Sequence, residues 1–486
     1  MIDVCFFLEG TYPYVAGGVS TWVHQLITAM RDIRFGIVYI APHSDPTRRL
    51  KYEVPNNVLY LKEIYLHDYN LAPQKKRKPK PQDYELIRTF YEELETNCFD
   101  SFRKFYELFR GEQSCFDTQS FFSSEKIFDL LNYFYDRYSP GISYIDFFWT
   151  WRGTHLPLLQ SLTAEIPAAK IYHSISTGYA GLISAIARQS HGGKLFLTEH
   201  GIYTHERTLE ISQANWIYER EQRHFRAERE LSFFKTWWIR MFQLMNGITY
   251  HACDQIFTLF EGNKVRQILS GAEPEKISII PNGIDIRGTL EIRRNNRPHP
   301  QIALIGRVVN IKDIKTFILA ARLVLKTLPK AQFHVIGPFT EERDYYDECK
   351  LLVETLNLEE NISFTGPVNV REYYQFLDVV VLTSLSEAQP YVILEANLAG
   401  IPMVATDVGA CREMLEGRDE PDKILGKSGL LTEVSSPEST ATAILKLIQD
   451  PALYKSCSEA GRARIQSYYD QDDLFSRYLN LYERNL

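Results

Sequence analysis

The chain has 486 residues, of which 45% are hydrophobic and 24% charged, values typical of a globular protein with two or three domains. Its net charge of −7 argues against a nucleic-acid-binding protein, which usually presents a basic face. No apolar run reaches the ~18 residues of a membrane-spanning helix, and seven cysteines without a C-x-x-C pair indicate free thiols in a reducing compartment.

The amino terminus, MIDVCFFLEG, reads as a short strand that ends at Glu9. It lacks the basic start and the longer apolar core of a secretory signal. We therefore expect a cytoplasmic protein, with peripheral attachment at the inner membrane through partner proteins as an open alternative.

Two adjacent glycines, Gly17 and Gly18, follow this strand and open a helix with apolar residues at Val19, Trp22 and Val23. Glycine lets backbone N–H groups come close to an anion, and a helix N-terminus adds positive potential there. The pair is thus a candidate donor-binding turn. A tight connection from strand to helix, with no ligand, is the simpler alternative.

Short apolar runs alternate with longer helical patterns along most of the chain, both before and after a polar, proline-containing segment at 293–300. Such runs indicate strands buried on both faces of parallel sheets. The sequence therefore predicts an α/β protein with two Rossmann-like domains, over 1–290 and 291–466, and an amphipathic last helix within 467–486. The predicted strands cover residues 4–8, 36–40, 170–172, 195–198, 255–259, 278–280, 302–305, 332–336, 379–382 and 403–406.

The segment from about 61 to 150 interrupts this alternation and is rich in aromatic residues. Residues 84–109 and 120–138 have helical patterns, which predict a helical insertion in the first domain. A basic run at 75–80 within it is either a solvated loop or a contact with an anionic lipid surface or acidic partner. The insertion as a whole is either a stabilising cap or a recognition element.

Two histidines end predicted strands of the first domain, His173 in the sequence IYH and His200 in the sequence LTEH. At the carboxyl ends of parallel strands, both would face the edge of the sheet where α/β proteins bind ligands. Each is therefore a candidate substrate contact, although a lone histidine is more often structural.

The second half of the chain carries a pair of cations after a buried strand, in the sequence GRVVNIK. Arg307 and Lys312 would stand at the carboxyl end of this strand, beside the crevice where ligands bind. A guanidinium and an ammonium held in this way suit a diphosphate.

A more specific pattern is EAQPYVILEA at 387–396. Proline fits the first turn of a helix, so Glu387 lies in the loop before the helix and Glu395 lies inside it. Backbone N–H groups near Tyr391 and Val392 would address a phosphate, while the two carboxylates would accept hydrogen bonds from hydroxyl groups. A helix start with favourable acidic residues is the alternative.

In order along the chain, GGV, PNGID at 281–285, GRxxxxK and two glutamates separated by seven residues resemble the retaining GT-B glycosyltransferases of family 4, relatives of glycogen and sucrose synthases. The resemblance is strongest over 1–18 and 256–409. It implies two Rossmann-like domains with parallel sheets facing a cleft, and a last helix that crosses back to the first domain. One departure is Ala388, where the family usually has glycine.

The same resemblance implies roles for the candidate residues. Arg307 and Lys312 would bind the diphosphate of a UDP-sugar, Glu395 its ribose and Glu387 its sugar, while His173 or His200 would be the catalytic-domain histidine. No cofactor and no metal are expected, since the UDP-sugar is a substrate and fixed cations stabilise the leaving diphosphate.

A closer resemblance rests on EGTYPYVAGGVSTW, HSISTGYAG, TEHGIYTHER and EAQPYVILEA, and points to the PelF-type glycosyltransferases of bacterial Pel exopolysaccharide assembly. It implies transfer of glucose or an N-acetylhexosamine to a growing polysaccharide acceptor, with membrane-embedded Pel-type proteins as partners. Two alternatives stay open: a non-catalytic GT-B scaffold subunit of a membrane complex, and a nucleotide-sugar epimerase.

Overall fold

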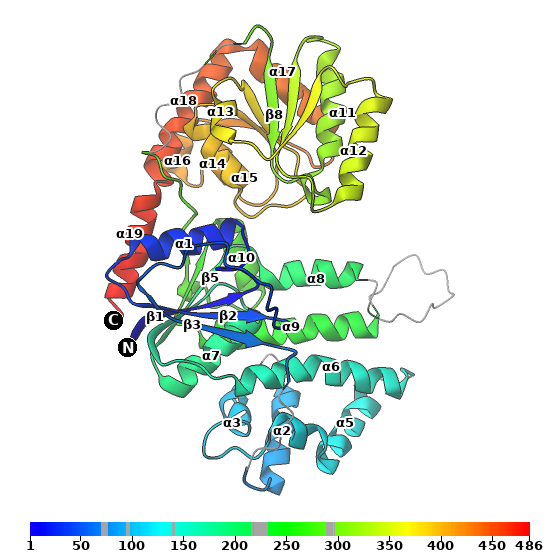
Figure 1. Ribbon diagram of the computed structural model, residues 1–486, viewed down its shortest axis with the longest axis vertical. Helices are drawn as coiled ribbons and strands as arrows, with labels where there is room; N and C mark the ends of the chain where they lie inside the picture. Colours follow the sequence, from blue (N-terminus) through cyan, green and yellow to red (C-terminus); the bar gives the residue numbers. More distant parts are fainter. Residues whose placement is uncertain are drawn as a thin grey trace. The chain divides into compact units, whose positions relative to one another are not determined.

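The computed structural model describes residues 1–69, 76–93, 98–138, 141–214, 217, 232–287, 295 and 297–486. The chain divides into two compact units, each with its own sheet (Figure 1). The first unit comprises Met1–Thr258, Lys264–Ser278 and Leu479–Leu486, and the second comprises Leu259–Asn263 and Ile279–Tyr478. Both sheets are flanked by helices, which confirms the predicted α/β class with two parallel-sheet domains.

The sheet of the first unit has seven strands in the order β3-β2-β1-β4-β5-β6-β7, and its pairs from β3 to β6 are parallel. Figure 1 shows α1 on one side of this sheet and α7 and α9 on the other. Since both faces are covered, β2 and residues 4–8 of β1 read as unbroken apolar runs. The strands are β1 Ile2–Glu9, β2 Phe35–Ala41, β3 Val58–Tyr65, β4 Ala169–Ser174, β5 Lys194–Glu199, β6 Gln255–Thr258 and β7 Ile277–Ile279, and the helices named here are α1 Gly18–Ala29, α7 Tyr179–His191, α8 Tyr203–Gln213, α9 Phe233–Ala252 and α10 Glu261–Leu269.

A group of helices lies between β3 and β4, from Pro81 to Thr163, later in the sequence than the insertion expected over 61–150. Residues at its expected start belong to β3, an edge strand with Lys62 and Glu63 in its sequence, and α6 runs past its expected end through Gly153 and Pro157. Of the basic run at 75–80, Lys75 lies outside the described residues. The helices are α2 Pro81–Glu93, α3 Phe102–Glu107, α4 Thr118–Phe122, α5 Glu125–Tyr138 and α6 Tyr144–Thr163.

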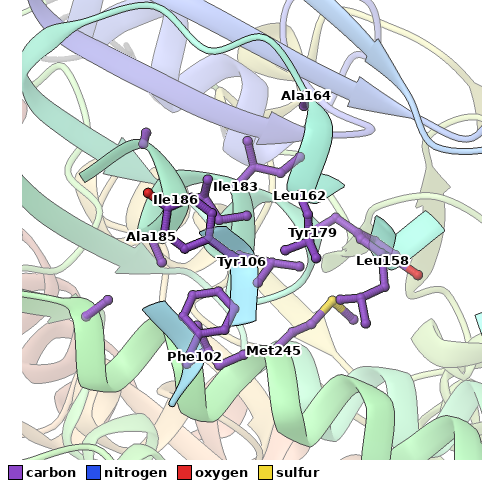
Figure 2. Packing of buried hydrophobic residues seen from close by; sticks show 14 of the residues in the cluster. Phe102, Tyr106, Leu158, Leu162, Ala164, Tyr179, Ile183, Ala185, Ile186 and Met245 are labelled. Atoms are coloured by element: carbon purple, nitrogen blue, oxygen red, sulfur yellow. The ribbon is translucent and has the colours of Figure 1, made fainter. Parts of the chain in front are cut away.

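These helices share a hydrophobic core with the Rossmann-like part of the first unit. Figure 2 shows Phe102 and Tyr106 of α3 close to Ile186 of α7 and Met245 of α9. All four side chains are buried in one cluster that continues into the sheet. The inserted helices are therefore an integral part of the first unit's core.

The sheet of the second unit has six strands in the order β10-β9-β8-β11-β12-β13, all paired in parallel. One buried cluster unites a face of the sheet with α11, α12 and α17, and another unites the opposite face with α14 and α15. The strands are β8 Gln301–Ile305, β9 Gln332–Ile336, β10 Ile362–Gly366, β11 Val379–Leu382, β12 Met403–Thr406 and β13 Gly429–Thr432, and the helices are α11 Ile314–Leu325, α12 Arg343–Thr355, α13 Val370–Tyr374, α14 Tyr391–Leu398, α15 Cys411–Glu416, α16 Glu420–Lys423, α17 Pro437–Gln449 and α18 Pro451–Tyr468.

The last helix, α19 Gln471–Glu483, belongs to both units, because the contacts of its final residues assign Leu479–Leu486 to the first. Tyr482 is fully buried there, with its ring beside Phe35 of β2 and Phe196 of β5. None of the described helices combines the length and apolar character needed to cross a bilayer.

Candidate functional site

The two cations after β8 lie in different surroundings. Arg307 is 53% exposed and its Nη1 donates to both carboxylate oxygens of Glu341 at 2.6 Å. Lys312 is only 20% exposed, and its Nζ donates to Oε1 of Glu387, itself 13% exposed. The structure therefore brings two of the predicted site residues, Lys312 and Glu387, into direct contact.

Hydrogen bonds tie the segment that carries Lys312 to the loop that carries Glu387. The Thr383 hydroxyl donates to the backbone carbonyls of Lys312 and Asp313, each at 2.9 Å, and Leu385 N donates to the carbonyl of Ile311 at 2.8 Å. These bonds hold a loop after β11 against a loop after β8, the neighbouring strand. These hydrogen bonds therefore hold in place the two loops whose side chains, Lys312 and Glu387, form the ion pair.

Two residues that sequence reasoning missed complete this frame. The hydroxyl of Ser384 donates to Oε1 of Glu387 at 2.7 Å. Gly409 has φ +55, and a Cβ there would lie 2.1 Å from the carbonyl oxygen of Glu387, so only glycine fits. Because Gly409 follows β12, more than twenty residues after the loop it supports, no local pattern pointed to it.

The helix α14 presents its N-terminus next to the same loop, with Pro390 as the residue before its first turn. No side chain of the described residues caps this end, which leaves the first N–H groups, at Tyr391 and Val392, available to an anion. Glu395, one turn further, accepts a hydrogen bond at Oε2 from the Tyr374 hydroxyl at 2.8 Å. Burial raises the pKa of Glu395, and the Tyr374 bond partly offsets the rise.

Gln389, the residue after the departure from the family pattern at Ala388, makes contacts of its own. Gln389 is buried, and its Oε1 accepts from the backbone N–H of Asn282 at 2.7 Å while its Nε2 donates to the Asn282 carbonyl at 3.4 Å. Asn282 belongs to the PNGID segment. The side chain of Gln389 therefore joins two of the motifs that carry the resemblance.

In the first unit, Gly17 and Gly18 are exposed at the start of α1. The φ of Gly17 is 171°, ordinary extended backbone, and a Cβ there would meet no atom within 4 Å. Neither backbone strain nor close packing therefore accounts for glycine at this position. Its backbone N–H reaches the Tyr52 hydroxyl at 3.5 Å.

His173 is a core residue rather than a side chain open to substrate. It is fully buried, with Nδ1 2.6 Å from the Tyr482 hydroxyl and Nε2 2.8 Å from the Thr198 hydroxyl, and its ring stacks on Phe6. Burial lowers its pKa to about 3, which keeps the imidazole neutral. Both ring nitrogens serve the fold, so this placement does not support a sugar contact.

His200 directly follows β5 and is 9% exposed. Its ring lies edge-on to the Trp22 indole of α1, with centroids 4.9 Å apart. Burial lowers its pKa to about 4, so it too is neutral near pH 7. Because α1 is the helix that Gly17 and Gly18 open, the structure brings His200 and the glycine turn to the same side of the first unit's sheet.

No cluster of three or more His, Cys, Asp or Glu side chains with metal-binding geometry occurs in the described part of the chain. The charged groups of the second unit can bind two different parts of a ligand. Two cations and an uncapped helix start can bind a diphosphate, and two carboxylates can accept hydrogen bonds from hydroxyl groups.

Family models match nearly the whole chain. Residues 2–275 match the model described as "Domain of unknown function (DUF3492)", and residues 289–464 match "Glycosyl transferases group 1". The two matches correspond closely to the two units of the fold.

Curated relatives match this chain over part of its length. One is D-inositol 3-phosphate glycosyltransferase of Paenarthrobacter aurescens, 28% identical over 37% of this chain and 45% of that protein. Another is N-acetyl-alpha-D-glucosaminyl L-malate synthase of Bacillus anthracis, 28% identical over 50% of this chain and 60% of that protein. The chain thus spans about half the length of the curated relatives it matches.

Solved structures match the fold over its full length. Sucrose-phosphate synthase from Thermosynechococcus elongatus has a TM-score of 0.58 at 16% identity and covers 99% of this chain and 98% of its own. Anabaena HepE in complex with UDP has a TM-score of 0.58 at 15% identity and covers 100% of both chains. These likenesses show the GT-B fold.

Proposed function

Because the chain belongs to the DUF3492 family and carries a group 1 glycosyl transferase domain over residues 289–464, we propose that it transfers a sugar from a UDP-sugar to an acceptor. The observation that carries this proposal is the arrangement of Lys312, Glu387 and the open start of α14 on adjoining loops of the second unit. UDP bound to HepE, a chain of the same fold, supports a uridine nucleotide as the donor.

Each residue of this set has one role in the proposed complex. Arg307 and Lys312 bind the diphosphate together with the N–H groups of Tyr391 and Val392. Arg307 can leave Glu341 at little cost, since an exposed ion pair is worth about 0–1 kcal/mol. Oε1 of Glu395, which Tyr374 does not use, accepts from the ribose, and Glu387 accepts from hydroxyls of the sugar.

The proposed chemistry requires no enzyme nucleophile. As the bond between the anomeric carbon and the diphosphate breaks, negative charge grows on the leaving diphosphate, and the cations and the helix start would stabilise that charge. Losing one such donor costs about 3 kcal/mol of barrier. The acceptor hydroxyl attacks from the face that the diphosphate leaves and passes its proton to the departing diphosphate oxygen, so configuration at the anomeric carbon is retained. The turn at Gly17 and Gly18 contacts the donor, and His200 contacts hydroxyls of its sugar.

The finer part of the proposal concerns the acceptor. The four motifs similar to the PelF-type enzymes support a growing exopolysaccharide as acceptor, glucose or an N-acetylhexosamine as the sugar, and membrane-embedded Pel-type proteins as partners. A non-catalytic GT-B scaffold is the competing function. The intact set of cations and carboxylates favours the enzyme, because a scaffold has no need of them.

The test is a transfer assay on the full chain with UDP-glucose, UDP-N-acetylglucosamine and UDP-N-acetylgalactosamine, in the presence of membranes as acceptor source. We expect UDP release with one donor, a product with retained configuration, and undiminished activity in excess EDTA because protein cations replace a metal. UDP binding without turnover of any donor would favour the scaffold. Activity lost in EDTA and restored by magnesium or manganese would refute metal independence.

A further inference from the structure

A cavity of about 570 Å³ opens on the second unit, apart from the residues assigned to the donor. Gln301, the first residue of β8, lines it, whereas Arg307 follows the last residue of that strand. The cavity therefore meets β8 at the opposite end from Arg307, and its lining runs along β10 from Ser363 and past the end of that strand to Val368. It shares no lining residue with the donor set.

The floor of the cavity is a line of paired polar side chains across three strands. His334 of β9 lies 2.9 Å from Ser363 of β10 through Nδ1, and 2.9 Å from Gln301 of β8 through Nε2. Strands of a parallel sheet are usually apolar on both faces, yet β9 and β10 alternate polar and apolar residues here. That alternation indicates a sheet face left open to a polar ligand.

The wall of the cavity is aromatic. The rings of Tyr373 and Phe376 lie 5.9 and 6.1 Å from the His334 ring, at 72° and 76° to it. The guanidinium of Arg297 lies 4.8 Å above the Phe376 ring. Of the described residues that line the cavity, Arg297 alone carries a formal charge, since burial lowers the pKa of His334 and leaves it neutral.

We propose that this cavity is a second saccharide-binding site, which holds one or two sugar residues of the glycan that the enzyme extends. The inference rests on the proposed function for the identity of the glycan. A pyranose ring offers an apolar face to Tyr373 or Phe376 and a rim of hydroxyls to neutral donors and acceptors. A nucleotide would need several cations for its phosphates, and the volume is within the range of small-ligand sites.

A second saccharide site would help the enzyme to keep the same acceptor glycan bound from one transfer to the next. A glycan held at two places on one chain rebinds at a high effective concentration after each transfer. The second site would therefore favour successive additions to one chain over release after a single addition.

The test is calorimetric titration of the full chain with the hexamers of glucose and of N-acetylglucosamine, and separately with UDP. Ser363→Trp fills the cavity from an exposed strand position, and Phe376→Ala removes part of its wall. Ser456→Trp, at an exposed position of α18, is the matched control. Melting temperature confirms that each variant folds.

We expect the wild type and Ser456→Trp to bind at least one hexamer, both cavity variants to bind it about tenfold or more weakly, and UDP affinity to stay constant. A tenfold loss corresponds to about 1.4 kcal/mol. Absence of hexamer binding to the wild type, or equal binding by Ser363→Trp, would overturn the second site while leaving the donor site intact. Failure of the wild type to bind UDP would instead count against the proposed function.

Discussion

At the scale of single residues, the proposed donor site depends on side chains that other side chains hold in place. Lys312 is held by Glu387, Glu387 by Ser384, and Glu395 by Tyr374. Such pairing lowers the entropy that each side chain would lose on binding a ligand. The residues that contact the nucleotide can therefore be substituted separately from the residues that position them.

The ribose contact of Glu395 can be tested by removing either partner of the hydrogen bond. We expect the wild type to bind UDP more tightly than 2′-deoxy-UDP, by about tenfold, since a hydrogen bond to a charged group is worth about 1.5–3 kcal/mol. In Glu395→Ala that preference should disappear, because the acceptor is gone. Calorimetry of both nucleotides on both proteins checks this. A preference that survives the substitution would place the ribose elsewhere.

The buried histidines predict a pH dependence of stability. Burial lowers the pKa of His173 to about 3, whereas the unfolded value is 6.5. The unfolded chain therefore takes up a proton as pH falls below 6.5 that the folded chain refuses. This contribution to the free energy of unfolding is full above pH 6.5 and is lost as pH falls toward 3, at no more than about 1.4 kcal/mol per pH unit.

His173→Asn should remove that contribution, so its unfolding free energy should fall less steeply with acid than that of the wild type. Urea unfolding between pH 7 and pH 5 measures both slopes. Tyr482→Phe is the matched control: it removes the same hydrogen bond, at about 1 kcal/mol, but keeps the imidazole and hence the wild-type slope. Equal slopes for His173→Asn and the wild type would be inconsistent with a neutral buried His173.

At the scale of elements, the strands that the sequence did not reveal are edge strands. β3, β10 and β13 each stand at the end of a sheet, where one side of the strand meets solvent and the apolar run is broken. Central strands, buried on both faces, were recognisable for the opposite reason. The helix α6 was hidden because Gly153 and Pro157 lie within it.

The site residues also differ in whether a local sequence pattern reveals them. Arg307, Lys312, Glu387 and Glu395 follow strand or helix patterns that are local in sequence. Tyr374 and Gly409 support them from other elements, and only the folded chain brings such partners together. His173 lies inside β4 and His200 directly follows β5, and both are buried. The hydrogen bonds of His173 to Tyr482 and Thr198, which mark it as a core residue, could not be read from the sequence.

The basic residues at 76–80 of the helical insertion differ in their contacts. Lys76 donates to the Phe109 carbonyl and Ser114, and Arg77 binds both carboxylate oxygens of the buried Asp83. Lys78 and Lys80 are exposed. The first pair therefore holds the insertion together, and only the second pair is suited to an external anionic surface.

We expect Lys78→Glu combined with Lys80→Glu to reduce association with the membrane fraction of cells while leaving the melting temperature and UDP affinity unchanged. Each basic residue near an anionic surface contributes about 1 kcal/mol. Arg77→Ala is the contrasting variant and should lower the melting temperature, because it leaves the Asp83 carboxylate buried and unpaired. Membrane association unchanged in the double variant would reduce the insertion to a stabilising part of the core.

At the scale of the whole molecule, the proposed function divides between the two units. The second unit, which contains most of the group 1 glycosyl transferase match, carries the cations, the carboxylates and the helix start that suit a nucleotide-sugar. The first unit, which contains most of the DUF3492 match, carries Gly17, Gly18, His200 and the inserted helices. Changes to these residues of the second unit should therefore weaken UDP binding most strongly.

The most direct test of the central claim is calorimetric titration of UDP into the wild type, Lys312→Ala and Lys315→Ala. Lys315 is the matched control, since it is the second residue of α11 and pairs with the exposed Glu348. We expect tight binding to the wild type and to Lys315→Ala, and a loss of about tenfold or more in Lys312→Ala, where the diphosphate lacks a partly buried cation. Equal UDP affinity in Lys312→Ala and Lys315→Ala would contradict the donor site.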